Sequence, residues 1–194
     1  VPTAALQEPP ASPPADWGPM SINLEDVPYP YPVSYLSFTL DGQDVEAPVG
    51  ETIFRTARRY GIKLPHLCYS PQPGYRADGN CRVCMVEIEG ERVLAASCLR
   101  KPTSGMKVGV ATERAEKARR MVFELLVADQ PARETAHDPD SKFWNWADKV
   151  GVSTSRFPGT EHPAYDVSHP AMSVNLDACI ECNLCVRACR EVQV

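Results

Sequence analysis

The segment that decides the fold runs from residue 61 to residue 84 and reads GIKLPHLCYSPQPGYRADGNCRVC. It contains Cys68, Cys81 and Cys84, and Cys98 further along completes the spacing C-x12-C-x2-C-x13-C. The two thiolates of a C-x2-C turn can bind one iron, while two cysteines from separate segments bind a second iron. The first set of cysteines therefore predicts a site for a [2Fe–2S] cluster.

The composition around these cysteines suits such a site. Gly74 and Gly79 allow a close approach of the main chain, so that N–H groups can point at cluster sulfides. Hydrogen bonds of this kind help to set a reduction potential. Three basic side chains, Arg76, Arg82 and Arg100, are predicted to offset the negative charge of the cluster.

Three alternatives for the first set are weighed against the cluster. Zinc ribbons carry two C-x2-C pairs, whereas this set has one pair and two distant single cysteines. Disulfides are disfavoured because the chain shows no secretory signal and two of its cysteines are only two residues apart. His66 lies two residues before Cys68, but four cysteines complete the ligand set, so we expect a packed or surface histidine.

A second set of four cysteines follows the pattern C-x2-C-x2-C-x3-C near residue 190. In bacterial ferredoxins with this run, the fourth cysteine binds a different cluster from the first three. We therefore predict that Cys179, Cys182 and Cys185 bind one [4Fe–4S] cluster and that Cys189 binds a second. Because the other ligands of both clusters are missing from the sequence, we expect it to be the front part of a longer polypeptide. A three-iron cluster, or a ligand from another protein, is the alternative.

Composition excludes several other functions. The chain has 194 residues with 20 basic and 25 acidic side chains, a formal net charge of −5. Nucleic-acid binding needs a concentrated basic face, so no nucleic-acid partner is expected. No apolar run approaches the ~20 residues of a membrane helix. We expect a soluble, cytoplasmic protein without a membrane partner.

Hydrophobic periodicity predicts a small mixed sheet packed on one helix. Leu36, Phe38 and Leu40 alternate with polar residues, as a half-buried strand requires. A short helix after residue 52 buries Ile53 and Ala57 on one stripe. Strands are predicted at 34–40, 43–49, 83–88, 93–96 and 107–110.

The second half is predicted to be more helical. Thr112 is a good N-cap for a helix over 113–128, and an aromatic helix over 143–150 ends at Gly151. The rest of 132–170 reads as connecting loop. The predicted organisation is a proline-rich flexible leader at 1–33, a [2Fe–2S] domain at 34–111, a helical and loop connector at 112–170, and the start of a [4Fe–4S] motif at 171–194.

Residues 34–110 resemble the [2Fe–2S] ferredoxin-like domain, of the β-grasp type, that starts the large iron–sulfur subunit of NADH:quinone oxidoreductase. Related subunits of NAD-linked hydrogenases and formate dehydrogenases begin in the same way. The resemblance is carried by the segments 61–68 and 79–84, and it implies that all four cysteines of the first set are cluster ligands. The implied fold is α+β, with a helical connector and the start of a bacterial-type 2[4Fe–4S] ferredoxin-like module.

The connector departs from the NADH:quinone oxidoreductase pattern. In that subunit a histidine and three cysteines hold a [4Fe–4S] cluster after the long helix. Here residues 99–178 contain no cysteine, and His137 stands alone. We therefore expect this intermediate cluster to be missing.

Two further segments, 124–131 and 175–194, resemble the α subunit of soluble NAD-linked formate dehydrogenases. The resemblance implies a molybdenum or tungsten catalytic domain downstream and a partner subunit that binds flavin and NAD, a diaphorase. The chain itself would relay electrons and hold no catalytic residue. The alternatives are a free-standing carrier, a subunit of a hydrogenase or NADH dehydrogenase, and a zinc-stabilised structural module.

Overall fold

The computed structural model describes residues 34–72, 75–159, 161, 164–177 and 179–193. The predicted leader and Gly74 lie outside these ranges. Contacts divide the chain into residues 1–30 and 31–194, and every described residue belongs to the second unit. Among the described helices, none has both the length and the apolar character needed to cross a membrane.

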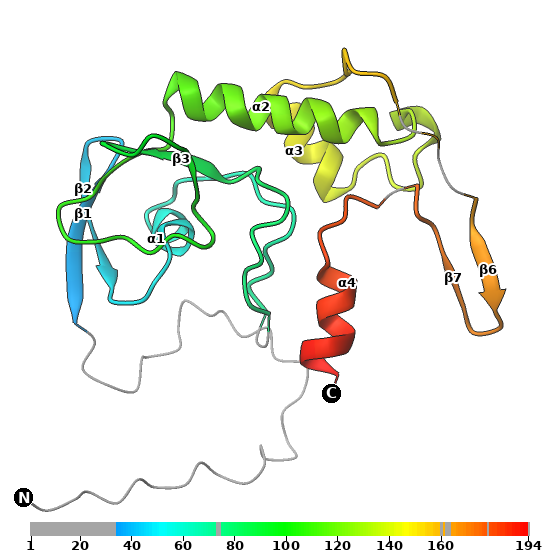
Figure 1. The fold of residues 1–194 in the computed structure, drawn as a ribbon, viewed down its shortest axis with the longest axis horizontal. Coiled ribbons are helices and arrows are strands. Elements are labelled where there is room, and N and C mark those ends of the chain that lie inside the picture. Colours follow the sequence, from blue (N-terminus) through cyan, green and yellow to red (C-terminus); the bar gives the residue numbers. More distant parts are fainter. Residues whose placement is uncertain (1–33, 73–74, 160, 162–163, 178, 194) are drawn as a thin grey trace, which may run out of the picture. The chain divides into compact units, whose positions relative to one another are not determined.

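Five of the described strands form one mixed sheet, ordered β2-β1-β5-β3-β4. Figure 1 labels three of them, β1, β2 and β3. The strands are β1 (Tyr35–Leu40), β2 (Gln43–Pro48), β3 (Met85–Ile88), β4 (Ala95–Ala96) and β5 (Lys107–Gly109). Strand β1 pairs antiparallel with β2 and parallel with β5, and β3 pairs antiparallel with both β5 and β4. The sheet and its helices confirm the predicted mixed α+β class.

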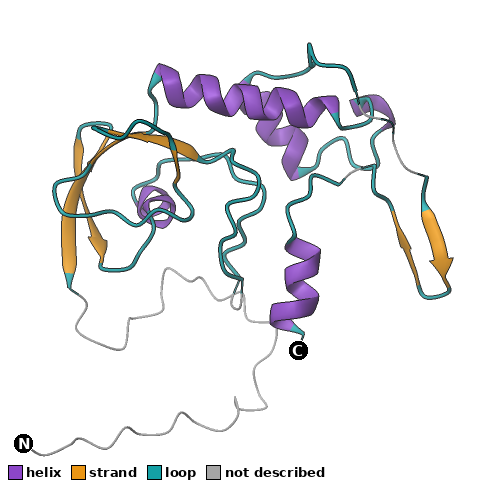
Figure 2. Ribbon diagram, in the orientation of Figure 1, coloured by secondary structure: helices purple, strands orange, loops and turns teal. Residues whose placement is uncertain are grey.

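The first hairpin and helix form as their local sequence predicts. Asp41 and Gly42 both take positive φ, 49° and 82°, which matches the twist of a two-residue hairpin turn. Helix α1 (Ile53–Arg59) begins after Thr52, whose hydroxyl accepts from the Arg55 amide at 3.4 Å. The helix lies against the sheet (Figure 2) and buries Phe54 completely.

All five predicted strands are shorter than expected, three of them by one residue and two of them by two residues. The strand predicted at 83–88 begins at Met85, and the strand predicted at 93–96 begins at Ala95. The late start of β3 follows from the turn before it, where Arg82 takes a left-handed φ of 55°. This turn takes Val83 out of the sheet pairing, so that β3 begins directly after a cysteine of the first set.

The two longer helices follow the capping signals. Helix α2 (Glu113–Ala128) has the predicted bounds, and the Thr112 hydroxyl accepts from the Ala115 amide at 3.2 Å. Helix α3 (Lys142–Val150) begins one residue earlier than predicted, because Ser141 caps it by accepting from the Trp144 amide at 3.5 Å. A single turn of 3-10 helix, η1 (Arg133–Thr135), lies between them.

The connector contains a hairpin where we expected only loop. Strands β6 (Asp166–His169) and β7 (Met172–Val174) pair antiparallel, and every residue in them is exposed. With no buried face, no hydrophobic alternation marks them in the sequence. A four-residue helix α4 (Leu184–Arg187) and a π-helical turn η2 (Ala188–Val192) follow in the second cysteine set.

The interior is divided into two hydrophobic cores. The first core lies between the sheet and α1 and includes Cys84 and Cys98. The second core lies under α2 and α3 and includes Cys68 and Cys81. The rings of Phe123 from α2 and Phe143 from α3 lie 6.0 Å apart in it. The first cysteine set therefore lies where the two cores meet.

Candidate metal centre

The four cysteines of the first set are all buried. Their exposed fractions are 1% for Cys68, 6% for Cys81, 1% for Cys84 and 1% for Cys98. Cys68 and Cys81 lie on the long loop after α1, Cys84 immediately precedes β3, and Cys98 follows β4. All eight cysteines of the chain are free thiols.

The four sulfurs contact one another in pairs. The Cys68 amide donates to Cys81 Sγ at 3.5 Å, and thiol hydrogen bonds connect Cys68 with Cys81 and Cys98. These bonds lower the pKa of Cys68 to about 2 and raise the pKa of both partners. A hydrogen bond with Cys98 lowers the pKa of Cys84 to about 7. Two thiols of the set therefore favour the thiolate form, which is the form that binds metal.

The arrangement suits a cluster with more than one iron. Within the described ranges, no group of three or more His, Cys, Asp or Glu side chains is placed to hold a metal ion. A [2Fe–2S] cluster distributes four thiolates over two irons, so it needs pairs of neighbouring sulfurs rather than four around one point. The four buried cysteines make such contacts, between Cys68 and Cys81 and between Cys84 and Cys98, with a further contact between Cys68 and Cys98. This differs from the sequence prediction that the two cysteines of the C-x2-C turn share one iron, because Cys81 lies in the second core and Cys84 in the first.

The main chain around Cys84 and Cys98 is held firmly. The carbonyl of Cys84 accepts from the Ser97 amide at 3.2 Å and from the Ser97 hydroxyl at 2.7 Å. The Phe54 amide of α1 donates to the Ser97 carbonyl at 3.0 Å. Because Ser97 is fully buried, water does not compete for these hydrogen bonds. They hold the main chain of the two cysteines against the first core.

The loop between Cys68 and Cys81 makes a close approach at Gly79. This residue takes a φ of 67°, and a Cβ on it would lie 2.4 Å from Leu99 Cδ1. The tight neighbour of Gly79 is the segment that follows Cys98, and the prediction that its main chain directs N–H groups at cluster sulfides stays a prediction.

His66 is packed among aromatic rings. Its ring centroid lies 5.0 Å from that of Phe54 and 5.7 Å from that of Trp146. Its Nδ1 lies 3.1 Å from the Leu64 carbonyl, and burial lowers its pKa to about 4. These contacts favour the packed histidine over a metal ligand. His137 is exposed, on a part of the connector that holds no cysteine.

Two of the three arginines that are predicted to offset the cluster charge form ion pairs with carboxylates. Arg76 pairs with Glu191 at 3.1 Å, and Arg100 pairs with Glu91, so carboxylates already balance both arginines. Two other cations approach the site instead. Lys142 donates to the Tyr69 carbonyl at 3.5 Å, and burial lowers its pKa despite the cysteines of both sets around it.

The second of these cations is Arg187, whose guanidinium donates to the Cys68 carbonyl at 2.7 Å. No local signal in the sequence marks Lys142 or Arg187. Their partners lie 73 and 119 residues away along the chain, so only the folded structure shows the contacts.

The second cysteine set is built on a loop with unusual backbone angles. Glu181 and Asn183 take positive φ values of 52° and 58°, on either side of Cys182. The Glu181 amide donates to Cys179 Sγ at 3.4 Å, so main-chain N–H groups already turn toward sulfur. Three cysteines of this set are exposed, and Cys182 is half-buried against the second core.

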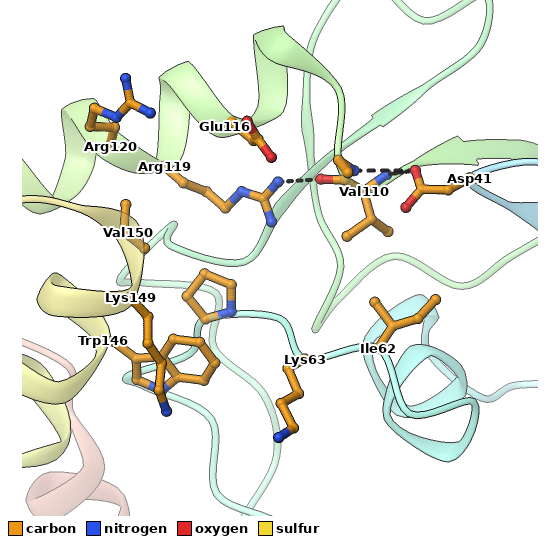
Figure 3. A pocket seen from close by; sticks show the side chains of 12 residues that line it. Asp41, Ile62, Lys63, Val110, Glu116, Arg119, Arg120, Trp146, Lys149 and Val150 are labelled. Atoms are coloured by element: carbon orange, nitrogen blue, oxygen red, sulfur yellow. Dashed lines mark hydrogen bonds between the residues drawn. The ribbon is translucent and has the colours of Figure 1, made fainter.

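A cavity of about 490 Å³ is lined by residues of α2, α3 and the segment 62–65 (Figure 3). Lys63, Arg119 and Lys149 line it, together with Trp146, whose ring lies 4.7 Å from Lys149 Nζ. Arg119 donates to the Val110 carbonyl, as the dashed line in Figure 3 shows. The residues that line this cavity include no cysteine, so it is distinct from the candidate metal centre.

Comparison with known proteins identifies the class of the first domain. Residues 34–113 match the family of the 2Fe-2S iron-sulfur cluster binding domain. This part of the chain is therefore a [2Fe–2S] ferredoxin-like domain.

The relatives of the chain are parts of larger oxidoreductases. The chain is 34% identical over 168 residues to the NADP-reducing hydrogenase subunit HndD of Solidesulfovibrio fructosivorans, covering 83% of this chain and 28% of that protein. It is 32% identical over 162 residues to a subunit of the NADH-quinone oxidoreductase of Rhizobium meliloti (strain 1021), covering 81% and 19%. The chain thus spans less than a third of the length of these two relatives.

A solved structure shows the same fold over most of the chain. It is the crystal structure of an NAD+-reducing [NiFe]-hydrogenase in the H2-reduced state, with a TM-score of 0.68 and 31% sequence identity. The match covers 79% of this chain and 65% of the hydrogenase chain. The named relatives are thus parts of hydrogenases and of an NADH-quinone oxidoreductase.

Proposed function

We propose that the chain transfers electrons within a multi-subunit, NAD-linked oxidoreductase, and that Cys68, Cys81, Cys84 and Cys98 hold its [2Fe–2S] cluster. The observation that carries this proposal is the group of four buried cysteines inside a [2Fe–2S] ferredoxin-like domain. When bound, the cluster supplies one-electron oxidation and reduction. The chain supplies ligands, spacing and shielding from water.

Shielding comes from the second core. Leu67 and Val83 flank the cysteines in sequence and are 3% and 0% exposed, and Trp144 of α3 covers the same core at 4%. Apolar walls of this kind limit solvent access, which is one of the factors that sets a cluster potential. The helices of the connector therefore cover the part of the first site that contains Cys68 and Cys81.

We further propose that Cys179, Cys182 and Cys185 bind a [4Fe–4S] cluster and that Cys189 binds another. Their spacing and the positive φ values beside Cys182 support this assignment, because such a loop directs both thiolates and amides inward. Electrons would then pass between the first set and the second.

The finer identity that we propose is the α subunit of a soluble NAD-linked formate dehydrogenase. The segments 124–131 and 175–194 support it by their resemblance to that subunit. Its partners would be a diaphorase subunit that binds flavin and NAD and a molybdenum or tungsten catalytic domain. Free thiols at all eight cysteines suit a reducing compartment, so the proposal places the protein in the cytoplasm.

A hydrogenase subunit is the second candidate. It is favoured by two of the relatives, the NADP-reducing hydrogenase subunit and the NAD+-reducing hydrogenase structure. Assays of the complete protein with formate and with hydrogen, each with NAD, distinguish the two. Reduction of NAD by formate supports our assignment, and reduction by hydrogen alone overturns it while leaving the cluster proposal intact.

The cluster proposal is tested by two matched substitutions in protein purified without oxygen. Cys84→Ser should abolish the rhombic EPR signal of the reduced [2Fe–2S] cluster, because Cys84 is a buried ligand. Cys189→Ser should leave that signal unchanged. Circular dichroism checks that both variants fold. A wild-type rhombic signal in folded Cys84→Ser protein refutes the ligand assignment.

A further inference from the structure

Arg187 of α4 is a fully buried arginine inside the second cysteine set, with 0% of its surface exposed. An arginine stays charged inside a protein, and a buried charge is costly unless it is paired and hydrogen-bonded. The partners that compensate the buried charge of Arg187 therefore indicate its role.

The partners of Arg187 come from both cysteine sets. Its Nη2 donates to the carbonyl of Cys68 at 2.7 Å and lies 3.4 Å from the carbonyl of Cys182. One nitrogen thus bridges the main chain of a cysteine in the first set and the main chain of a cysteine in the second. The Nε atom lies 3.4 Å from the Asn183 carbonyl, within the second set.

The loop of the first set completes the pocket for this guanidinium. Asp78 Oδ2 lies 3.2 Å from Arg187 Nε, and the Arg76 carbonyl accepts from Nη1. The Tyr75 ring lies 5.8 Å from the guanidinium carbon. Carbonyls cannot neutralise a cation, so Asp78 is the residue that balances the buried charge.

Two further contacts join the same two segments. Glu191 of η2 pairs with Arg76 at 3.1 Å, and Cys182 packs against the second core that contains Cys68 and Cys81. The ion pair is exposed and therefore weak. The buried bonds of Arg187 are the stronger connection between the two cysteine sets.

We propose that Arg187 is a positioning residue that fixes the second cysteine set against the loop of Cys68, and so sets the spacing between the two clusters. The inference rests on the proposed function and deepens it. In the transfer that it serves, one electron leaves a reduced cluster and enters an oxidised one, and no bond forms and no proton moves. The charge of Arg187 also lies beside ligand residues of both clusters.

The test compares three variants of the full-length protein, purified without oxygen. Arg187→Gln removes the charge and the fork of donors, and Arg187→Lys keeps only the charge. Arg190→Gln is the matched control, because Arg190 is an exposed arginine three residues away that pairs with Glu191 at 3.5 Å.

EPR of the fully reduced protein measures the magnetic interaction between the clusters, which depends on their spacing. We expect the wild type and Arg190→Gln to show it, and both Arg187 variants to lose it. The midpoint potential of the [2Fe–2S] cluster should fall in Arg187→Gln and stay near the wild-type value in Arg187→Lys. A role limited to stabilising the fold would not remove the magnetic interaction in Arg187→Lys, because lysine keeps a positive charge opposite Asp78.

Hydrogen exchange gives a second readout that needs no cluster. In Arg187→Gln the amides of residues 75–78 and 182–187 should exchange on the order of tenfold faster than in Arg190→Gln. If Arg187→Gln does not accumulate, Asp78→Asn removes the charge partner from the other side, and we expect faster exchange at 182–187.

Wild-type magnetic interaction and wild-type exchange in Arg187→Gln overturn the inference. If the wild-type protein contains no iron, the proposed function fails by itself, and the exchange experiment still decides whether Arg187 joins the two segments.

Discussion

The two cysteine sets are built in opposite ways. The first set is buried between two hydrophobic cores, and its members come from a long loop, the start of β3 and the end of β4. The second set lies on one short run of chain, and three of its four cysteines are exposed. The first site thus depends on the tertiary fold, whereas the second depends on local backbone angles and on its attachment to the first.

The largest expected effect comes from breaking the core over the first set. Phe123 is fully buried beside Phe143, and Phe123→Ala should lower the free energy of unfolding by about 3–5 kcal/mol. Leu125 lies on the same helix but is 47% exposed, so Leu125→Ala should cost less than about 1 kcal/mol. Urea denaturation measures the free energy of unfolding of both variants. Equal losses would show that the buried packing of Phe123 in the second core adds no stability over the exposed position of Leu125.

A substitution at Gly79 tests the packing of the loop between Cys68 and Cys81. Gly79→Ala should lower the free energy of unfolding by about 2 kcal/mol, because Ala is strained at a φ of 67° and its Cβ would displace Leu99. Gly61→Ala is the control, since its φ of 77° is similar but no atom lies within 4 Å of the added Cβ. If the two variants lose the same stability, the close approach at Gly79 contributes nothing.

Cluster loss tests the difference in exposure directly. On treatment with a chelator and a mild oxidant, iron should leave the exposed second set on the order of tenfold faster than the buried first set. EPR and absorbance followed over time distinguish the two clusters. Faster loss of iron from the first set would contradict the conclusion that burial protects the [2Fe–2S] site.

The smallest effect is expected at the surface. Arg100→Gln removes an exposed ion pair with Glu91 and should change the free energy of unfolding by less than about 1 kcal/mol. The [2Fe–2S] midpoint potential should also stay near the wild-type value, because Glu91 already balances this arginine. A clear shift in the potential would instead support the prediction from sequence that Arg100 offsets the cluster charge.

Local signals predict much of the first domain. The alternation at 36–40, the Asp41-Gly42 turn and the Thr112 cap depend on residues close in sequence, and the structure confirms each of them. The structure buries the first cysteine set, and its role as the ligand set stays a prediction from spacing and ligand chemistry.

Contacts between distant segments cannot be predicted from such local signals. The division of the first set between two cores depends on where α2 and α3 pack. Nothing in the sequence distinguishes Arg187 from a surface arginine, because the carbonyl of Cys68 and the carboxylate of Asp78 reach it only in the folded chain. The exposed hairpin of β6 and β7 lacks a buried face, so no periodicity marks it.

The central claim is that the buried cysteines of the first set bind iron and sulfide rather than zinc. Elemental analysis of the full-length protein, purified without oxygen, tests it most directly when Cys179, Cys182, Cys185 and Cys189 are all replaced by serine. We expect iron and acid-labile sulfide in equal amounts, close to two of each per chain, as a [2Fe–2S] cluster requires. Zinc without sulfide in that variant would contradict the account.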